Sequence, residues 1–94
     1  MRKYELVLVL QPELDDNAAN AIIEKVRGLI TEANGSVDKV DNWGRRRMAY
    51  QIRKQREGHY YLINATFAPT ACAEIERSLR FTESALRFML TLVD

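Results

Sequence analysis

The sequence predicts an α+β fold whose elements follow the order β-α-β-β-α-β. Apolar and polar residues alternate in four segments, which is typical of strands with one buried face. In two other segments the apolar residues recur three and four positions apart, the spacing of an amphipathic helix. The chain has 94 residues, a length that fits one small domain, so residues 1–94 are expected to form a single unit.

The chain begins with a strand and a helix. Residues 2–10 alternate strongly apolar with mixed positions, and a proline soon afterwards ends the strand. Asp15 or Asp16 can cap the helix that follows, and the pair Asn34-Gly35 is a typical C-terminal signal. The apolar face of this helix is expected to contain Ala19, Ile22, Val26, Leu29, Ile30 and Ala33.

A long hairpin occupies the middle of the chain. Residues 36–52 read as one irregular strand, with a bulge near Gly44, where the alternation is broken. The polar segment RKQREG forms the turn, and Gly58 is expected to supply an unusual backbone angle there. Residues 59–67 form the third strand.

A helix and a strand complete the chain. The segment after Pro69 forms a helix with Cys72, Ile75 and Leu79 on its inner side, and residues 85–93 form the last strand. Two βαβ units of this kind usually fold as a four-stranded antiparallel sheet with both helices on one face, the ferredoxin-like arrangement. The first and last strands should then be neighbours at the centre of the sheet.

The alternation also predicts which strand residues face the helices and which lie on the open face of the sheet. The helix-facing rows should be Leu6, Leu8, Leu10, Met48, Tyr50, Ile52, Tyr61, Ile63, Ala65, Phe67, Leu86, Phe88, Leu90 and Leu92. The open face should carry Lys3, Val7, Val9, Arg45, Arg47, Ala49, Tyr60, Leu62, Arg87 and Met89.

Positive charge is concentrated in one segment of a nearly neutral chain. The formal net charge is +1, yet the stretch from Trp43 to Glu57 contains six basic residues and one acidic residue. Such a segment attracts polyanions locally, although a solvated hairpin kept soluble by arginines would have the same composition. Because the open face mixes arginines with apolar residues, we expect a protein partner and a phosphate backbone to share it.

Enzymes and metal carriers also use this topology, but the sequence lacks their residues. The loop after the first strand, QPELDD, is acidic and has no glycine to cradle a phosphate. Cys72 is the only cysteine, which excludes an internal disulfide and most zinc sites. His59 is interpreted as a surface residue at the hairpin end. We therefore expect no catalytic residue, no metal, no cofactor and no small-molecule substrate; no signal peptide or membrane-spanning run is visible either.

An RNA-recognition motif is the main alternative, because it has the same element order and stacks bases on aromatic residues of its third strand. The segment REGHYYLINATF resembles its central signature. The match fails at Glu57, where a basic residue is expected, and at Asn64, which replaces the final aromatic residue. The signature also requires His59 and Tyr61 to be exposed, whereas the alternation places Tyr61 in the core.

Three segments of the chain resemble the bacterial ribosomal protein S6 family. They are MRKYELVLVLQPEL, NWGRRRMAYQIRKQREGHYYLIN and LRFTESALRFMLTLVD, and the resemblance covers essentially all of the chain. The central segment is fairly specific, with W-G-R-R followed by A-Y, a basic hairpin and G-H-Y. Two features depart from the family: Gln51 stands where proline is common, and the long acidic tail of some members does not follow Asp94.

The resemblance implies a structural protein of the small ribosomal subunit, in the cytoplasm of a bacterium or in an organelle. Members of the family bind the central domain of small-subunit ribosomal RNA together with ribosomal protein S18, with which they form a heterodimer. The expected partners are therefore this RNA and S18, and no membrane.

Two sets of residues are expected to make these contacts. The expected RNA-binding residues are Arg2, Lys3, Arg45, Arg46, Arg47, Arg80 and Arg87. The bulge at Gly44 should direct Arg45 and Arg47 out of the open face and Arg46 to the opposite side. The expected partner-binding residues are Val7, Val9, Trp43, Ala49, Tyr60, Leu62 and Met89. For Trp43 two interpretations stay open: it covers the sheet edge, or it stacks on the partner or on a base.

Overall fold

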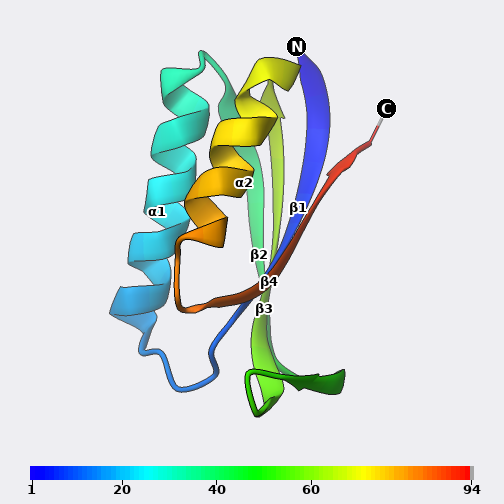
Figure 1. Ribbon diagram of the computed structural model, residues 1–94. Coiled ribbons are helices and arrows are strands. Elements are labelled where there is room, and N and C mark those ends of the chain that lie inside the picture. Colours follow the sequence, from blue (N-terminus) through cyan, green and yellow to red (C-terminus); the bar gives the residue numbers. More distant parts are fainter. Residues whose placement is uncertain (94) are drawn as a thin grey trace.

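A four-stranded antiparallel sheet is covered on one face by two helices in the computed structural model (Figure 1). The structure describes residues 1–93. The elements are β1 (Arg2–Leu10), α1 (Asp16–Glu32), β2 (Ser36–Ile52), β3 (Gln55–Phe67), a short 3-10 turn (Pro69–Ala71), α2 (Cys72–Arg80) and β4 (Ala85–Leu92). Their order and arrangement confirm the predicted ferredoxin-like α+β fold.

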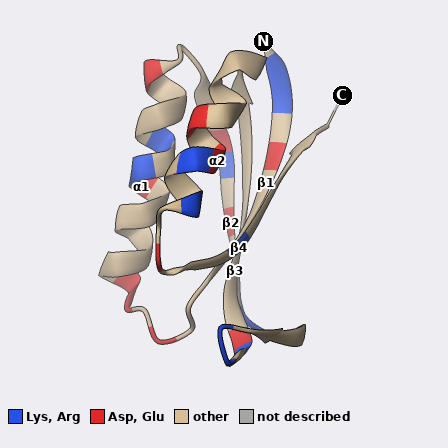
Figure 2. Ribbon diagram, viewed as in Figure 1, with Lys and Arg blue, Asp and Glu red and all other residues tan. Residues whose placement is uncertain are grey.

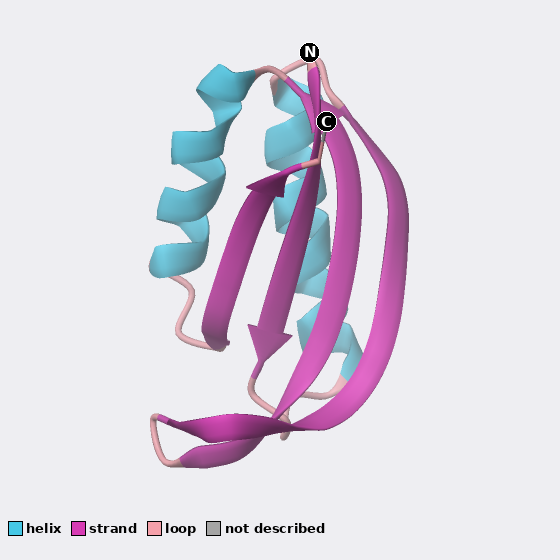
Figure 3. Cartoon of the chain, turned by 90° about the vertical axis from the view of Figure 1, so that its right-hand side faces the viewer, coloured by secondary structure: helices cyan, strands magenta, loops and turns pink. Residues whose placement is uncertain are grey.

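The strands lie in the order β2-β3-β1-β4. β1 pairs with both β3 and β4, so the first and last strands are neighbours as expected. β4 is nevertheless an edge strand, because the crossover through α2 carries the chain from β3 past β1 to the free side of that strand. The prediction that β4 lies at the centre of the sheet is therefore wrong; Figure 3 shows β2 and β4 along the two edges.

α1 begins and ends at the predicted signals. The Asp15 carboxylate caps the helix by accepting a backbone hydrogen bond from the first turn at 2.8 Å. At the other end Asn34 adopts a φ of 62°, and the Gly35 N–H donates to the carbonyl of Ile30 at 2.8 Å. Gly35 is also required for space, because an added Cβ would lie 2.4 Å from the Thr66 carbonyl oxygen. This contact brings the start of β2 against the end of β3.

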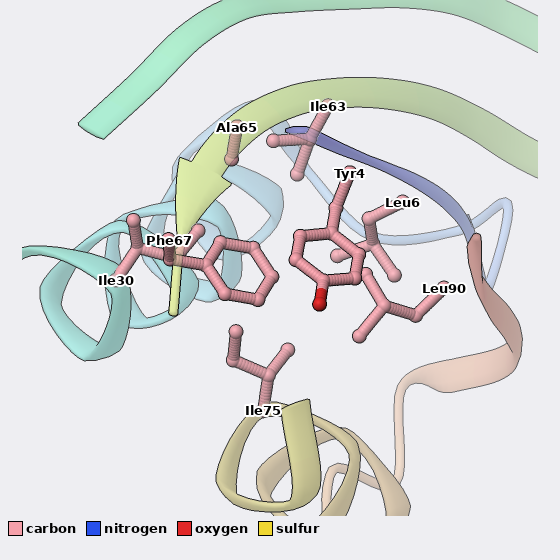
Figure 4. A pocket seen from close by; sticks show the side chains of 8 residues that line it. All are labelled: Tyr4, Leu6, Ile30, Ile63, Ala65, Phe67, Ile75 and Leu90. Carbon is pink, nitrogen blue, oxygen red and sulfur yellow. The ribbon is translucent and has the colours of Figure 1, made fainter. Parts of the chain in front are cut away.

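The core fills the space between the helices and the sheet. The rings of Tyr4 and Phe67 stack with their centroids 4.3 Å apart, and Ile30 of α1 and Ile75 of α2 lie beside them (Figure 4). The void among these side chains is about 10 Å³, at the lower limit for one water molecule. The alternation is confirmed in β1 and β3, whose core residues are Tyr4, Leu6, Leu8, Leu10, Tyr61, Ile63, Ala65 and Phe67.

The helix faces and β4 follow the prediction with three differences. At the start of β4 a register shift places Ala85, instead of Leu86, opposite Leu10 in the core. Ile23, rather than Ile22, is among the fully buried residues of α1, because it lies nearer the centre of the face that contacts the sheet. Phe88 and Leu90 of β4 pack against the core as expected. Leu92 is largely exposed instead of covered by the helices.

Tyr61 is buried in the core, and Asp16, the first residue of α1, is near enough to interact with it electrostatically. This burial, and to a smaller degree the nearby Asp16 carboxylate, raises the pKa of Tyr61 above its usual value of 10.0.

β2 and β3 continue beyond the helix layer as a hairpin, and we call residues 46–58 the arm. The arm bends toward the helix-free side and passes across the end of the sheet (Figures 1 and 3). Its turn is formed by Arg53 and Lys54, with φ angles of 50° and 67°, values that suit a tight hairpin turn. Gly58 lies inside β3 and has no positive φ. The prediction that Gly58 shapes the turn is therefore wrong.

Candidate nucleic-acid interface

The helix-free face gathers predicted residues from three strands. Residues paired directly across antiparallel strands project to the same face. The pairs on this face are Val7 with Leu62 and Met89, and Val9 with Tyr60 and Arg87. These six side chains therefore share the open face, as the alternation predicted. A hollow of about 220 Å³ is lined by Phe88 and by all of them except Leu62.

Val9 belongs to this face, but the arm covers it. Only 2% of its surface is exposed. Gly58 lies so close that an added Cβ would be 2.3 Å from Cγ1 of Val9 and 3.6 Å from the sulfur of Met48. Val9 therefore packs against the arm at Gly58, near Met48, and the expected exposure of Val9 to a partner is wrong.

The arm also places Tyr50 on the open side of the sheet. Nη1 of Arg87 donates a hydrogen bond to the Tyr50 hydroxyl at 3.0 Å, and Tyr50 is 60% exposed. The prediction that Met48, Tyr50 and Ile52 face the helices is therefore wrong, because this part of β2 has left the helix layer. A hollow between the arm and the sheet is lined by Met48, Ala49, Tyr50, Ile52, Tyr60 and Arg87.

The side chains of the arginine run lie on the opposite faces of β2 from those predicted. Asn42 pairs with Tyr61 whereas Gly44 pairs with Tyr60, so the bulge inserts one extra residue between them. This insertion reverses the alternation that follows. Arg46 consequently pairs with Gly58, in the open-face row of β3, whereas its two neighbours in the run pair with residues of the other row.

The direction predicted for the run is thus corrected: Arg46, rather than Arg45 and Arg47, has the parity of the open face. Arg45 pairs with His59, and Arg47 pairs with Glu57. All three arginine side chains are exposed, because the arm extends beyond the helices that would otherwise cover one of its sides.

An unpredicted hydrogen-bonded clamp holds the bulge. Gly44 has a φ of 76°, and its N–H donates to Oδ1 of Asn42 at 2.9 Å. The same oxygen lies 2.8 Å from Nε2 of His59, and since a carboxamide oxygen only accepts, the imidazole is the donor. The His59 ring also stacks on Tyr61 at 4.7 Å. His59 is therefore a structural residue that fixes where the arginine run begins.

Trp43 stands at the bulge and is 43% exposed. The guanidinium of Arg46 lies over its ring, 5.7 Å from the ring centroid, within the range of a cation–π contact. The two side chains present a flat, cationic surface beside the open face. The exposed part of the Trp43 ring is available to a ligand.

The other predicted basic residues are not gathered at this place (Figure 2). Arg2 and Lys3 lie at the start of β1, and Lys3 pairs with Thr66, six residues along β1 from Val9, or about 20 Å at the rise of a strand. Arg80 ends α2 in the helix layer. The basic residues of the open face thus include Arg46 and Arg87 near the arm, Lys3 at the opposite end, and Lys39, which pairs with Asn64 and forms an ion pair with Asp41 at 3.6 Å.

The structure also shows where the residues lie that an RNA-recognition motif or a metal site would require. Tyr61 is buried on the helix side with His59 stacked on it, so the exposed aromatic pair of an RNA-recognition motif does not form. Cys72 is partly buried against the core. Within residues 1–93, no group of three or more histidine, cysteine, aspartate or glutamate side chains could hold a metal ion. Neither α1 nor α2 has the length and apolar character required to cross a membrane.

Comparison with known proteins identifies close relatives along the whole chain. The family model described as "Ribosomal protein S6" matches residues 3–91. The small ribosomal subunit protein bS6 of Moorella thermoacetica is 42% identical over 94 residues, which cover 100% of this chain and 96% of the relative. The bS6 protein of Clostridium novyi is 47% identical over 90 residues, covering 96% and 95% of the two chains.

A solved structure has the same fold. The crystal structure of 30S ribosomal protein S6 from Thermotoga maritima superimposes with a TM-score of 0.90 at 29% sequence identity. The match covers 98% of this chain and 87% of that one.

Proposed function

The chain belongs to the ribosomal protein S6 family, and from that premise we propose that it binds the central domain of small-subunit ribosomal RNA together with ribosomal protein S18. It acts as a structural component of the small subunit in the bacterial cytoplasm and contributes to subunit assembly and translation. Because members of this family are ribosomal structural proteins, the expectation that the chain is not an enzyme is confirmed.

One observation carries the proposal: a partly exposed apolar row on the helix-free face lies beside exposed arginines. Val7, Leu62 and Met89 form this row across three adjacent strands, and Met89 is among the most exposed large apolar residues. On a sheet face that contacts only water, polar residues would occupy these positions. The apolar row therefore fits a protein partner, for which we propose S18.

The arginines beside this row are available to phosphate groups. Within residues 1–93, the ion pairs involve none of Arg45, Arg46, Arg47 or Arg87. Binding RNA would thus not require any of these guanidinium groups to leave a carboxylate. Arginine suits such a contact because its planar fork can hold a phosphate through two hydrogen bonds.

A free-standing RNA-binding module is the second candidate, and the buried position of Tyr61 argues against it. Tyr60 is the only aromatic residue of β3 in the open-face row, so the stacking platform of such a module would be incomplete. A chain with few basic residues on its open face is better suited to bind RNA through that face as half of a pair than alone.

Binding to a central-domain ribosomal RNA fragment, with and without S18, tests the proposal. We expect tight binding only with S18 present. Arg46→Gln should lower the slope of log affinity against log salt by about one, the effect of one lost phosphate contact. Lys25→Gln is a charge-matched control, because Lys25 is exposed on α1, on the other side of the molecule.

The partner surface is tested by Leu62→Asp. A partner interface there would lose S18 binding, because the new carboxylate would be buried without a counter-charge. Ala21→Asp introduces the same charge on the exposed side of α1 and should leave S18 binding unchanged. Equal RNA affinity with and without S18 would favour the free-standing module instead.

A further inference from the structure

We propose that a second RNA contact lies at the end of the molecule where α2 ends and the tip of the arm approaches it, and that Phe81 stacks on an unpaired base there. This inference rests on the proposed function, because it requires RNA to lie alongside the protein. It concerns a different surface, on the helix layer instead of the open face.

Phe81 is the most exposed large apolar residue among those described, with 77% of its surface accessible. It follows α2 directly, and its N–H donates to the carbonyl of Arg77 at 3.2 Å. The next residue, Thr82, returns a side-chain hydrogen bond to the Ser78 carbonyl at 2.8 Å. The backbone that carries the ring is therefore fixed, and the ring itself is open to a ligand.

Four basic residues lie at the same end of the molecule as this ring. Arg77 and Arg80 occupy the last turn of α2. Nη1 of Arg53, from the tip of the arm, donates to the Glu83 carbonyl oxygen at 2.6 Å, and this bond brings Arg53 and Lys54 beside a turn 30 residues away in sequence. The turn that follows α2 leads from the helix layer toward the end of the molecule where the arm lies (Figures 2 and 3).

The balance of charge at this end favours an anionic ligand. Among the described residues, Arg77 is the only one of the four in an ion pair, with Glu74 at 4.0 Å, and both partners are mostly exposed, so this pair is weak. Two further carboxylates oppose these charges: Glu83, and Glu13, which accepts a hydrogen bond from Gln55 beside the arm tip at 3.4 Å. The helix dipole alone would favour Arg77 and Arg80 at a C-terminus, but it does not account for the exposed phenylalanine that follows them in the chain.

The combination of a flat, exposed ring with flexible cationic side chains fits single-stranded RNA. A phenyl ring offers a surface for a base, and arginine and lysine offer charges for the phosphates on either side of it. A protein partner would require a broader apolar surface than one ring flanked by charges.

Fluorine NMR on chain labelled with 4-fluorophenylalanine can observe the contact directly. The sequence contains three phenylalanines, and Phe81→Leu assigns the resonance of interest. A five-nucleotide oligoadenylate RNA should shift the Phe81 resonance, whereas inorganic polyphosphate, which has charge but no bases, should not. Phe67 is an internal control, because it is 1% exposed. A Phe81 resonance that stays unmoved by the RNA, or moves equally with polyphosphate, would overturn the inference.

A second measurement separates this inference from the proposed function. In the complex with S18, Phe81→Ala should weaken binding to the central-domain fragment by about 5- to 150-fold, the usual effect of removing one stacking ring, whereas Phe81→Tyr should bind normally. If the complex binds the fragment tightly and Phe81→Ala has no effect, the inference is wrong and the proposed function stands. If the complex does not bind the fragment, both are wrong.

Discussion

Gly58→Ala should destabilise the chain by forcing the arm away from β1. The added Cβ would lie 2.3 Å from Cγ1 of Val9, and 3.6 Å from both the Met48 sulfur and the Leu10 carbonyl oxygen. Met48 has a flexible side chain and can move, but Val9 is β-branched and buried, so its methyl group has few alternative positions. The clash must be relieved by a shift of the strand or by a strained rotamer.

The expected magnitude follows from two opposing effects. Overpacking a filled site costs about 1–3 kcal/mol, whereas alanine is favoured over glycine inside a strand by about 0.5–1 kcal/mol. The midpoints of these two ranges leave a net loss of unfolding free energy of about 1 kcal/mol. For a domain of this size, that corresponds to a decrease in Tm of about 4–8 °C.

Urea denaturation of a double-mutant cycle provides the assay. Val9→Ala alone should also destabilise, because it removes buried methyl groups. In the double variant, the Cβ added at position 58 would occupy space that the valine methyl groups no longer fill. The double variant should therefore lose less unfolding free energy than the sum of the losses of the two single variants. Gly28→Ala is the control, since a Cβ there has nothing within 4 Å. A Gly58→Ala protein as stable as the wild type would refute the close packing of the arm on Val9.

Three further changes test other parts of the structure. Asn42→Ala should decrease the free energy of unfolding by about 1–2 kcal/mol, because it removes the oxygen that accepts hydrogen bonds from the Gly44 N–H and the His59 ring. Hydrogen exchange at the Gly44 amide should become faster, and unchanged exchange there would contradict the clamp. Gly35→Ala should cost more than Gly58→Ala, since its Cβ would meet the backbone at Thr66 rather than a side chain; calorimetry would contradict this if the Tm decreased less. Tyr61→Phe should retain stability above about pH 10 that the wild type loses. In the wild type the tyrosine of the unfolded chain ionises near pH 10, whereas the raised pKa keeps the folded one protonated, so the free energy of unfolding decreases as the pH increases through this range. Parallel curves of stability against pH for the two proteins between about pH 9 and pH 12 would contradict this prediction.

The regular strands could be predicted from the sequence because their alternation is uninterrupted. In β1 and β3 each residue faces the side that its parity indicates, from Tyr4 to Leu10 and from Tyr61 to Phe67. The helix signals were equally local: Asp15 caps α1, and Asn34 ends it with a left-handed conformation. Such features depend on neighbouring residues alone, and the sequence contains all of the information about them.

The arm could not be predicted in the same way, because its geometry depends on long-range pairing. β2 changes register against β3 at three places, and each inserted residue exchanges the two faces of the strand beyond it. Only the shift beside Gly44 has a sequence signal. Tyr50 lies within the last shift, so its parity carried no information about its contact with Arg87. Val9 had the expected parity, but its burial depends on an arm that the alternation of β1 does not describe.

The same register shifts have a consequence for self-association. β2 is an edge strand of 17 residues, and a long edge with free backbone groups can pair with a second chain and start aggregation. A second strand can pair with this edge only if the free backbone N–H and C=O groups are regularly spaced along it, and the bulges in β2 interrupt that spacing. An approaching copy of β2 would also bring its own arginine run against Arg45, Arg46 and Arg47. The irregularity that makes this strand difficult to predict therefore protects the monomer against edge-to-edge aggregation.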